Sequence, residues 1–396
     1  MAEASLLIKQ REMNLIKNKY LFAGIVTLFA FFSCQKEELQ GNSSDSIRFN
    51  VKVAEIKNAA TRSTLHTGNT LTSGSFGVLG YCVPHVPGTQ STEDLIGASK
   101  TWDEKKDNSH PDVLYKQKVD ISNGSTTYEY KHPESGTVIA GAAPWVTTYA
   151  NGSDPATYTY SFFAYYPFED GVWTVVTPQS QLGTPQFAFS MPFNSTNTNT
   201  SLADANIKDV MVAATYDRTC FDGAVPLNFN HVLTGINVRA QNASTSNYSN
   251  IYITSVTLYG TFNKTVTIDF DDDPPTVSGN YKGTFTFYPN TSGQTLTLSN
   301  GSTINFGNGK TILLLPHYEY GLGVDENNDV TLSVSYKTRN SNRAPTTTKN
   351  ISLKGFRPVA GINYTLNLVF ARSAIQLSVT PGENWEDGGD SSSTIK

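Results

Sequence analysis

The sequence is short of charged residues and of helix-forming stretches, and both shortages limit what the protein can be. Only 16% of its 396 residues are charged, and the formal net charge of −5 gives no reason to expect nucleic acid or an anionic membrane surface as a partner. Long runs of Glu, Lys, Ala and Leu with a period of 3.6 residues are missing, which argues against a helical protein. Tyr, Thr, Ser, Asn and Gly dominate instead, a composition typical of a secreted all-β protein.

Common catalytic motifs are missing as well. The sequence contains neither His-Glu-x-x-His nor Gly-x-Ser-x-Gly. Gly309-Lys310-Thr311 is similar to the end of a phosphate-binding loop, but Ile304 stands where that loop needs glycine, and we expect a strand where a helix would have to follow. We therefore predict a turn at this position and a protein that is not an enzyme and binds no cofactor.

Two acidic segments raise the question of a bound cation. Residues 325–329 open like a calcium loop, but Val330 and Tyr336 occupy the positions of its glycine and its bidentate carboxylate. Asp269 and residues 271–273 supply four carboxylates within five positions, followed by two prolines. A solvated turn is favoured for both segments, so we predict no metal site, with a cation at the second segment as the alternative.

Residues 13–33 have the pattern of a bacterial lipoprotein signal peptide. Lys17 and Lys19 precede an apolar run over residues 21–32. This run is far shorter than the roughly 20 residues that span a bilayer, so a transmembrane anchor is the less favoured alternative. It ends in Ser33-Cys34, and a small residue followed by Cys is where the lipoprotein peptidase cuts after the thiol has been acylated.

The signal peptide predicts the state of the mature N-terminus. We expect Met13 to be the true start, residues 1–33 to be removed and Cys34 to carry a fatty acid. The next residues, 35–38 (QKEE), resemble the short Lys-plus-acidic signal that sends lipoproteins of the Bacteroidetes to the outer face of the outer membrane. We interpret residues 34–46 as a lipidated tether and predict a surface-exposed lipoprotein of the cell outer membrane.

Alternating apolar and polar residues predict strands along the rest of the chain. Ile47, Phe49, Val51 and Val53 show the two-residue period of a half-buried strand. Similar runs cover residues 158–166, 209–214, 227–231, 236–240, 251–258, 284–288, 311–315, 330–336, 364–370 and 375–379. Turn-forming clusters separate them, and short strands with regular turns over about 360 residues predict sandwiches or barrels.

Two cysteines and one histidine have roles that the sequence leaves partly open. Cys82 and Cys220 remain once Cys34 is lipidated, and they form either a disulfide or two buried thiols, because sequence does not say whether their Cα atoms come close. His231 ends an alternating run. We expect it to be a hydrogen-bonded core residue rather than a metal ligand or a base.

Aromatic residues offer the main support for a rival hypothesis. The run 158–166 has aromatic side chains on both of its faces, which favours burial between two layers over a platform for sugars. Trp102, Trp145 and Trp173 stand in the first half of the chain, where we expect long surface loops. They leave open a monomeric surface lipoprotein that binds glycans.

Five segments of the chain resemble the fimbrillin family of Bacteroidales. The first three are SFFAYYP at residues 161–167, KDVMVA at 208–213 and VPLNFNH at 225–231. PVAGINY at 358–364 and the segment 379–389 look like the closing segments of the same family. Their order and spacing cover most of the chain that follows the tether.

The resemblance implies a lipoprotein precursor of a type V pilus, built from two transthyretin-like Greek-key β-sandwiches in tandem. We place these domains at residues 47–220 and 221–396, with the boundary in the turn-rich segment 217–224. The resemblance also implies assembly by donor-strand exchange, in which an arginine-specific protease removes the first strand and a neighbour's strand fills the groove. Other fimbrial subunits are then partners, together with a glycan or protein receptor on a host or bacterial surface.

The same resemblance predicts where the chain is cut. Residues 57–74 are small and polar, with Arg62 near the middle, and they follow directly on the first predicted strand. Exposed loops of this kind are where proteases cut. We predict cleavage after Arg62, with Arg48 or an uncut linker as the alternatives.

The C-terminal tail indicates the position of the subunit in a fibre. Residues 386–396 have Ile395 as their one apolar anchor, too little to fill a groove vacated by four apolar side chains. We therefore predict a subunit that accepts a strand more readily than it donates one, at the tip or as an accessory adhesin. The alternative is a stalk subunit in which residues 375–385 swing out as the donor.

Overall fold

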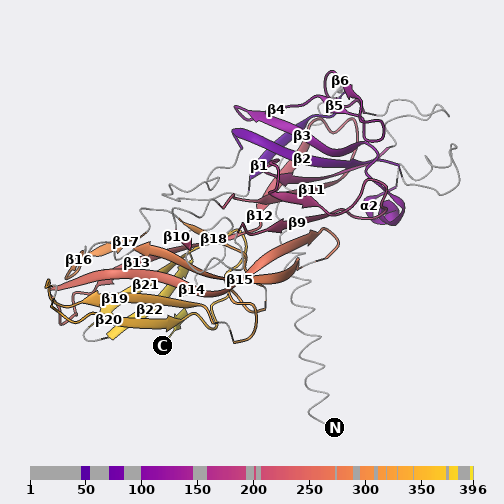
Figure 1. Cartoon of the computed structure of the whole chain (residues 1–396). Coiled ribbons are helices and arrows are strands. Elements are labelled where there is room, and N and C mark those ends of the chain that lie inside the picture. The colour runs from indigo at the N-terminus through magenta and orange to yellow at the C-terminus, as the bar shows by residue number, and fades with distance from the viewer. Residues whose placement is uncertain are drawn as a thin grey trace, which may run out of the picture. The chain divides into compact units, whose positions relative to one another are not determined.

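The fold belongs to the predicted all-β class. The computed structural model describes residues 46–53, 71–83, 100–145, 158–192, 200–201, 207–272, 274–288, 295–306, 311–317, 319–327, 329–341, 343–371, 374–381 and 393–395 (Figure 1). Within them the helical elements are short, namely α2 (Trp102–Lys105) and η3 (Lys106–Asn108). Among the described residues, no helix has the length and apolar character that a membrane crossing requires.

The first sheet has seven strands in the order β1-β12-β11-β7-β2-β3-β4. The bounds of these strands are β1 (Phe49–Val53), β2 (Ser73–Tyr81), β3 (Leu114–Ser122), β4 (Ser125–Thr127), β7 (Tyr160–Tyr166), β11 (Met211–Arg218) and β12 (Val225–His231). β1 runs parallel to β12, whereas the other described pairs of this sheet are antiparallel. Because β1 stands first in this strand order, it forms one edge of the sheet.

The remaining strands form a sheet of eight strands, a sheet of six strands and a hairpin. The eight-stranded sheet follows the path β10-β15-β14-β19-β20, with β16 and β9 paired to β14 and β8 paired to β9. Its bounds are β8 (Trp173–Val175), β9 (Gln186–Ser190), β10 (Thr200–Ser201), β14 (Asn250–Asp269), β15 (Thr276–Tyr288), β16 (Leu296–Ser299), β19 (Thr331–Lys337) and β20 (Thr347–Ser352). The six-stranded sheet follows the path β17-β13-β21-β22-β23, with β18 paired to β13. The bounds of its strands and of the hairpin β5–β6 are β5 (Tyr130–Lys131), β6 (Val138–Ile139), β13 (Thr234–Asn242), β17 (Thr303–Asn305), β18 (Ile312–Leu314), β21 (Asn363–Ala371), β22 (Ala374–Pro381) and β23 (Ser393–Ile395).

β12 belongs to the first sheet although it follows the predicted domain boundary between residues 220 and 221. It pairs with β1 along residues 225–229 and with β11 through Asn230 and His231. A boundary between residues 220 and 221 would cut β12 from both neighbours, so the first sheet ends at His231 instead. Conversely, β9 from the first half pairs with β14 of the eight-stranded sheet. The division into two domains stays a prediction.

Both faces of the first sheet contribute side chains to a core, although alternate residues of its outer strands β1, β3 and β12 are exposed. One face holds a cluster that we call the first core, which includes the apolar residues of β1 together with Phe76, Phe162 and Phe229. The opposite face contributes Phe163 and Tyr165 to a second core, which continues into the eight-stranded and six-stranded sheets. The eight-stranded and six-stranded sheets share this second core, so they are the layers of one β-sandwich.

A glycine in β2 shows how closely the strands of the first sheet pack. Gly77 pairs with Tyr165 of β7, and the ring of Tyr165 lies where a side chain at position 77 would stand. Any larger residue would displace this ring from the second core.

Candidate functional site

β1 is an edge strand whose apolar side chains are almost completely buried. Ile47 and Val51 are at most 1% exposed, and Phe49 and Val53 at most 5%. The residues between them are exposed. The alternation predicted for this segment is confirmed, and it means that one face of the strand fills a groove while the other meets solvent.

Phe49 is the aromatic anchor of β1. Its ring centroid lies 5.7 Å from that of Phe76 and 5.6 Å from that of Phe162, both in edge-to-face arrangement. The ring of Tyr128 lies at 5.9 Å on a third side. Such contacts add to the free energy gained by burying the ring, so Phe49 should hold β1 in its groove more strongly than its aliphatic neighbours do.

The two sides of β1 are held differently. On one side, residues 49–53 pair with β12 in a parallel ladder. On the other side, the hydroxyl of Thr126 donates to the carbonyl of Phe49 at 2.8 Å, and the hydroxyl of Tyr128 donates to the carbonyl of Ile47 at 3.0 Å. The Tyr128 hydroxyl also accepts from the amide of Ala143 at 3.1 Å, and burial raises its pKa well above the ordinary value. These are separate hydrogen bonds rather than a ladder, so loss of β1 leaves one sheet edge and several buried polar groups open.

The residues predicted to be modified lie outside the described part of the chain. Cys34 and Arg62 both fall there, as does the whole connection 54–70 between β1 and the segment leading into β2. Lipidation at Cys34 and cleavage after Arg62 therefore stay predictions.

The alternative donor segment, residues 375–385, is described as far as Pro381, and this described part belongs to a sheet. It lies within β22, which pairs with β21 on one side and with β23 on the other. Leu377 and Val379 are 2% and 3% exposed. In this conformation the segment belongs to an interior strand of the six-stranded sheet, and the tail residue Ile395 stands opposite Leu377.

The aromatic residues of the first half are structural. Every residue of β7 is buried, which confirms core packing for the aromatic run. The ring centroids of Trp102 and Tyr81 are 5.0 Å apart, and those of Trp145 and Tyr160 are 4.8 Å apart. Both tryptophans are at most 3% exposed. These two tryptophans cannot stack on a sugar without leaving the core.

Trp173 differs from these two because it is half-buried. Its indole Nε1 donates to the carbonyl of Tyr166 at 2.9 Å, and its ring packs against Phe189 at 5.7 Å. It therefore covers the edge of the second core instead of standing free in solvent.

His231 is hydrogen-bonded in the core, as predicted. Its Nδ1 lies 2.8 Å from Oδ1 of Asp209, and both side chains are at most 1% exposed. Asp209 is a partner that the sequence did not indicate. The pair links the end of β12 to the residues that precede β11, at the end of the first sheet.

The acidic segments have the hydrogen bonding of turns. Oδ1 of Asp269 accepts from the amide of Asp271, whose own carboxylate contacts Lys106 at 3.0 Å and Thr184 at 2.6 Å. Asp329 accepts from the amide and the hydroxyl of Thr261. No cluster of three metal-ligating side chains occurs among the residues that the structure describes. Asp273 and Asn328 are not described.

Cys82 and Cys220 are both buried thiols. Cys82 directly follows β2, and Lys105 donates from Nζ to the Cys82 carbonyl at 2.9 Å. The alternative of two buried thiols therefore describes this pair better than a disulfide does.

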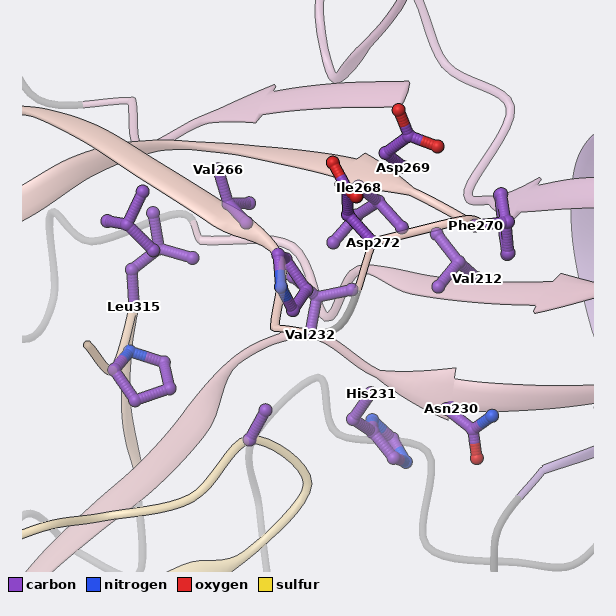
Figure 2. Close-up of a pocket in the computed structure, with 14 residues that line it drawn as sticks. Val212, Asn230, His231, Val232, Val266, Ile268, Asp269, Phe270, Asp272 and Leu315 are labelled. Carbon is purple, nitrogen blue, oxygen red and sulfur yellow. The ribbon is translucent and has the colours of Figure 1, made fainter. Parts of the chain in front are cut away.

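A pocket of about 420 Å³ opens at the end of β12 (Figure 2). Asn230, His231 and Val232 line one side, and Asp269 and Asp272 stand across from them in Figure 2. Most other lining side chains are apolar and come from β11, β14, β15 and the segments around residues 315 and 360. No local pattern signals this pocket, because its walls are remote from one another in the sequence.

Residues 154–385, which are more than half of the chain, match the model of the fimbrillin-like family. The chain belongs to that family. Its members are fimbrial structural proteins, so this fimbrillin-like chain is a pilus subunit or adhesin of a surface-exposed fimbrium, and other fimbrial subunits are its expected partners.

Solved structures with low sequence identity are similar to this fimbrillin-like chain. A candidate cell adhesion protein from Bacteroides ovatus has 12% identity and a TM-score of 0.44, over 87% of this chain and 99% of that one. A fimbrial assembly protein from Parabacteroides distasonis has 10% identity and a TM-score of 0.36, over 88% and 99%. The tip fimbrial protein Mfa3 from Porphyromonas gingivalis, with a C-terminal truncation, has 9% identity and a TM-score of 0.34, over 85% and 98%. No curated protein matches the chain.

Proposed function

We propose that this fimbrillin-like chain is an outer-membrane lipoprotein precursor whose β1 is removed by proteolysis, after which a partner's strand enters the vacated groove. Cys34 carries the lipid in this scheme, and the cut follows Arg62. The observation that carries the proposal is the construction of β1, an edge strand with buried apolar side chains that connects to the rest of the sheet through the small, polar segment 54–70.

The groove supplies the free energy for strand entry. Each of the four buried side chains, from Ile47 to Val53, contributes roughly 1.5–3 kcal/mol by burial. Removal of β1 also exposes the edge of β12, whose amide and carbonyl groups bind any extended segment that completes the ladder. An empty groove is therefore less stable than one occupied by a partner's strand.

The tip or accessory position is the finer part of the proposal. The segment 375–379 is already paired with β21 and β23, and its departure would expose Leu377 and Val379. The groove of β1 opens when a single strand leaves the edge of its sheet. This difference supports a subunit that accepts a strand more readily than it donates one.

The mature protein taken from intact cells gives the test. Its mass and N-terminal sequence report lipidation and cleavage together. We expect an N-terminus at residue 63 in fibre fractions and a lipidated Cys34 on the released fragment. An intact chain beginning at Cys34 in assembled fibres would contradict the proposal.

A further inference from the structure

The pocket at the end of β12 lies where a strand in the β1 groove would continue. In the parallel register of these strands, Val53 is opposite Phe229. The next residue of a strand that continued in this register would stand opposite Asn230. Asn230 lines the pocket, together with the two residues that follow it. The groove and the pocket are therefore consecutive positions along one strand edge.

The alternation of side chains decides which way that next residue would point. Val51 and Val53 belong to the first core, so the following side chain faces the opposite side of the sheet. Asn230 is on this opposite face, as is Val212 of the second core, which pairs with it in β11. Both line the pocket. A side chain one residue beyond Val53 would thus be directed to the pocket and not to the first core.

The lining of the pocket selects the chemistry of such a side chain. Val212, Val232 and Ile268 give apolar walls, while Asp269 and Asp272 supply carboxylates on one side (Figure 2). None of the described residues that line it is Lys or Arg. This combination suits a long side chain with an apolar stem and a positive end, because the stem is buried while the charge meets the carboxylates.

The two carboxylates are not equally available. Oδ2 of Asp269 accepts from Nε2 of Gln186 at 2.7 Å, and its Oδ1 accepts from the amide of Asp271 at 3.0 Å. Asp272 is exposed at the side of the pocket, next to Ile268 in Figure 2. Asp272 is therefore the better acceptor for an incoming cation.

We propose that this pocket is a specificity subsite for the partner's strand, where it binds a lysine or arginine one residue beyond the segment that replaces β1. The inference rests on the proposed function and names the chemistry of the partner. The chain's own residue after Val53 is Ala54, whose methyl group has no charge to offer. A partner strand with a basic residue at this position therefore gains a contact that β1 lacks, which favours exchange over return of β1.

Strand exchange into the full chain tests the subsite. A specific protease site is inserted within residues 54–70 and cut after purification, so that β1 is no longer tethered. Four fluorescent peptides carry the sequence of residues 46–53 followed by alanine, norleucine, lysine or glutamate. Fluorescence anisotropy reports their affinity for the groove. We expect the lysine peptide to bind at least threefold more tightly than the alanine peptide, norleucine to lie between them, and glutamate to bind most weakly.

Two variants test whether the preference for lysine depends on Asp272 or only on the overall charge of the protein. Asp272→Asn should lower the affinity of the lysine peptide to that of the norleucine peptide. High salt should have the same effect, because salt screens an ion pair that is partly exposed. Asp120→Asn is the matched control, since it removes an exposed carboxylate from β3 and should leave the preference unchanged. Equal binding of all four peptides would overturn the subsite while leaving strand exchange intact. Failure of every peptide to enter the groove would overturn the proposed function as well.

Discussion

Phe49→Ala should destabilise the precursor strongly and the strand-exchanged subunit not at all. Phe49 is 5% exposed, and its ring centroid lies within 5.9 Å of the centroids of three other aromatic rings. Removal of the Phe49 ring would leave a cavity between them. Replacement of a buried Phe by Ala costs about 3–5 kcal/mol. This is a large share of the roughly 5–15 kcal/mol by which a domain is stable.

Urea unfolding of the precursor measures this loss, with Asn50→Ala as the control. Asn50 is the next residue of the same strand and is exposed, so its replacement should change the free energy of unfolding by no more than about 0.5 kcal/mol. The same two variants are then compared after cleavage and binding of a partner strand. Because β1 is absent from that form, the two variants should have equal stability there.

Two results would refute this reasoning. One is a Phe49→Ala precursor as stable as the Asn50→Ala precursor, which would mean that β1 does not anchor the first core. The other is a loss of similar size in the strand-exchanged form, which would mean that β1 stays in its groove after assembly.

Three further predictions concern the ends of the chain and its pH dependence. Cys34→Ala should abolish labelling by a radioactive fatty acid, and continued labelling would exclude Cys34 as the lipidated residue. Arg62→Ala should prevent the appearance of a mature N-terminus at residue 63, and an unchanged N-terminus by sequencing would exclude this site. Burial raises the pKa of Asp112 from 3.8 to about 6, so the folded chain binds a proton there at a pH where the unfolded chain does not. The free energy of unfolding should therefore rise as the pH falls from about 7 to about 5. In Asp112→Asn the midpoint of urea unfolding should depend less on pH over this range.

The strands that the sequence predicted are those whose side chains alternate clearly. The run over residues 47–53 gave β1 because its inward positions are all apolar, and the aromatic run gave β7 because both of its faces are buried. β14 was predicted only over residues 251–258, yet it continues to Asp269. Its second half contains many half-buried residues, since it passes from pairing with β16 and β19 to pairing with β15 and β9. Such changes of partner leave no local pattern.

The groove could be predicted from the sequence, whereas the pocket beside it could not. Burial of Phe49 follows from the alternation around it. That β12, which follows residue 220, belongs to the first sheet does not follow from any local pattern, because it depends on a parallel pairing with a strand that lies far away in the sequence. The pocket needs Asn230, Asp272 and Leu315 to meet, and these residues belong to β12 and to two other segments that are remote from it in the sequence.

A reversible lock on β1 tests the central claim most directly. Lys52 and Asn228 are exposed and stand opposite each other in the parallel ladder, where neighbouring strands are about 4.8 Å apart and paired cysteines can form a disulfide. Lys52→Cys combined with Asn228→Cys should permit folding and cleavage but prevent incorporation into fibres, and a reducing agent should restore it. Each single variant should assemble normally. Normal assembly of the oxidised double variant, with the disulfide confirmed by mass, would contradict the exchange of β1 for a partner's strand.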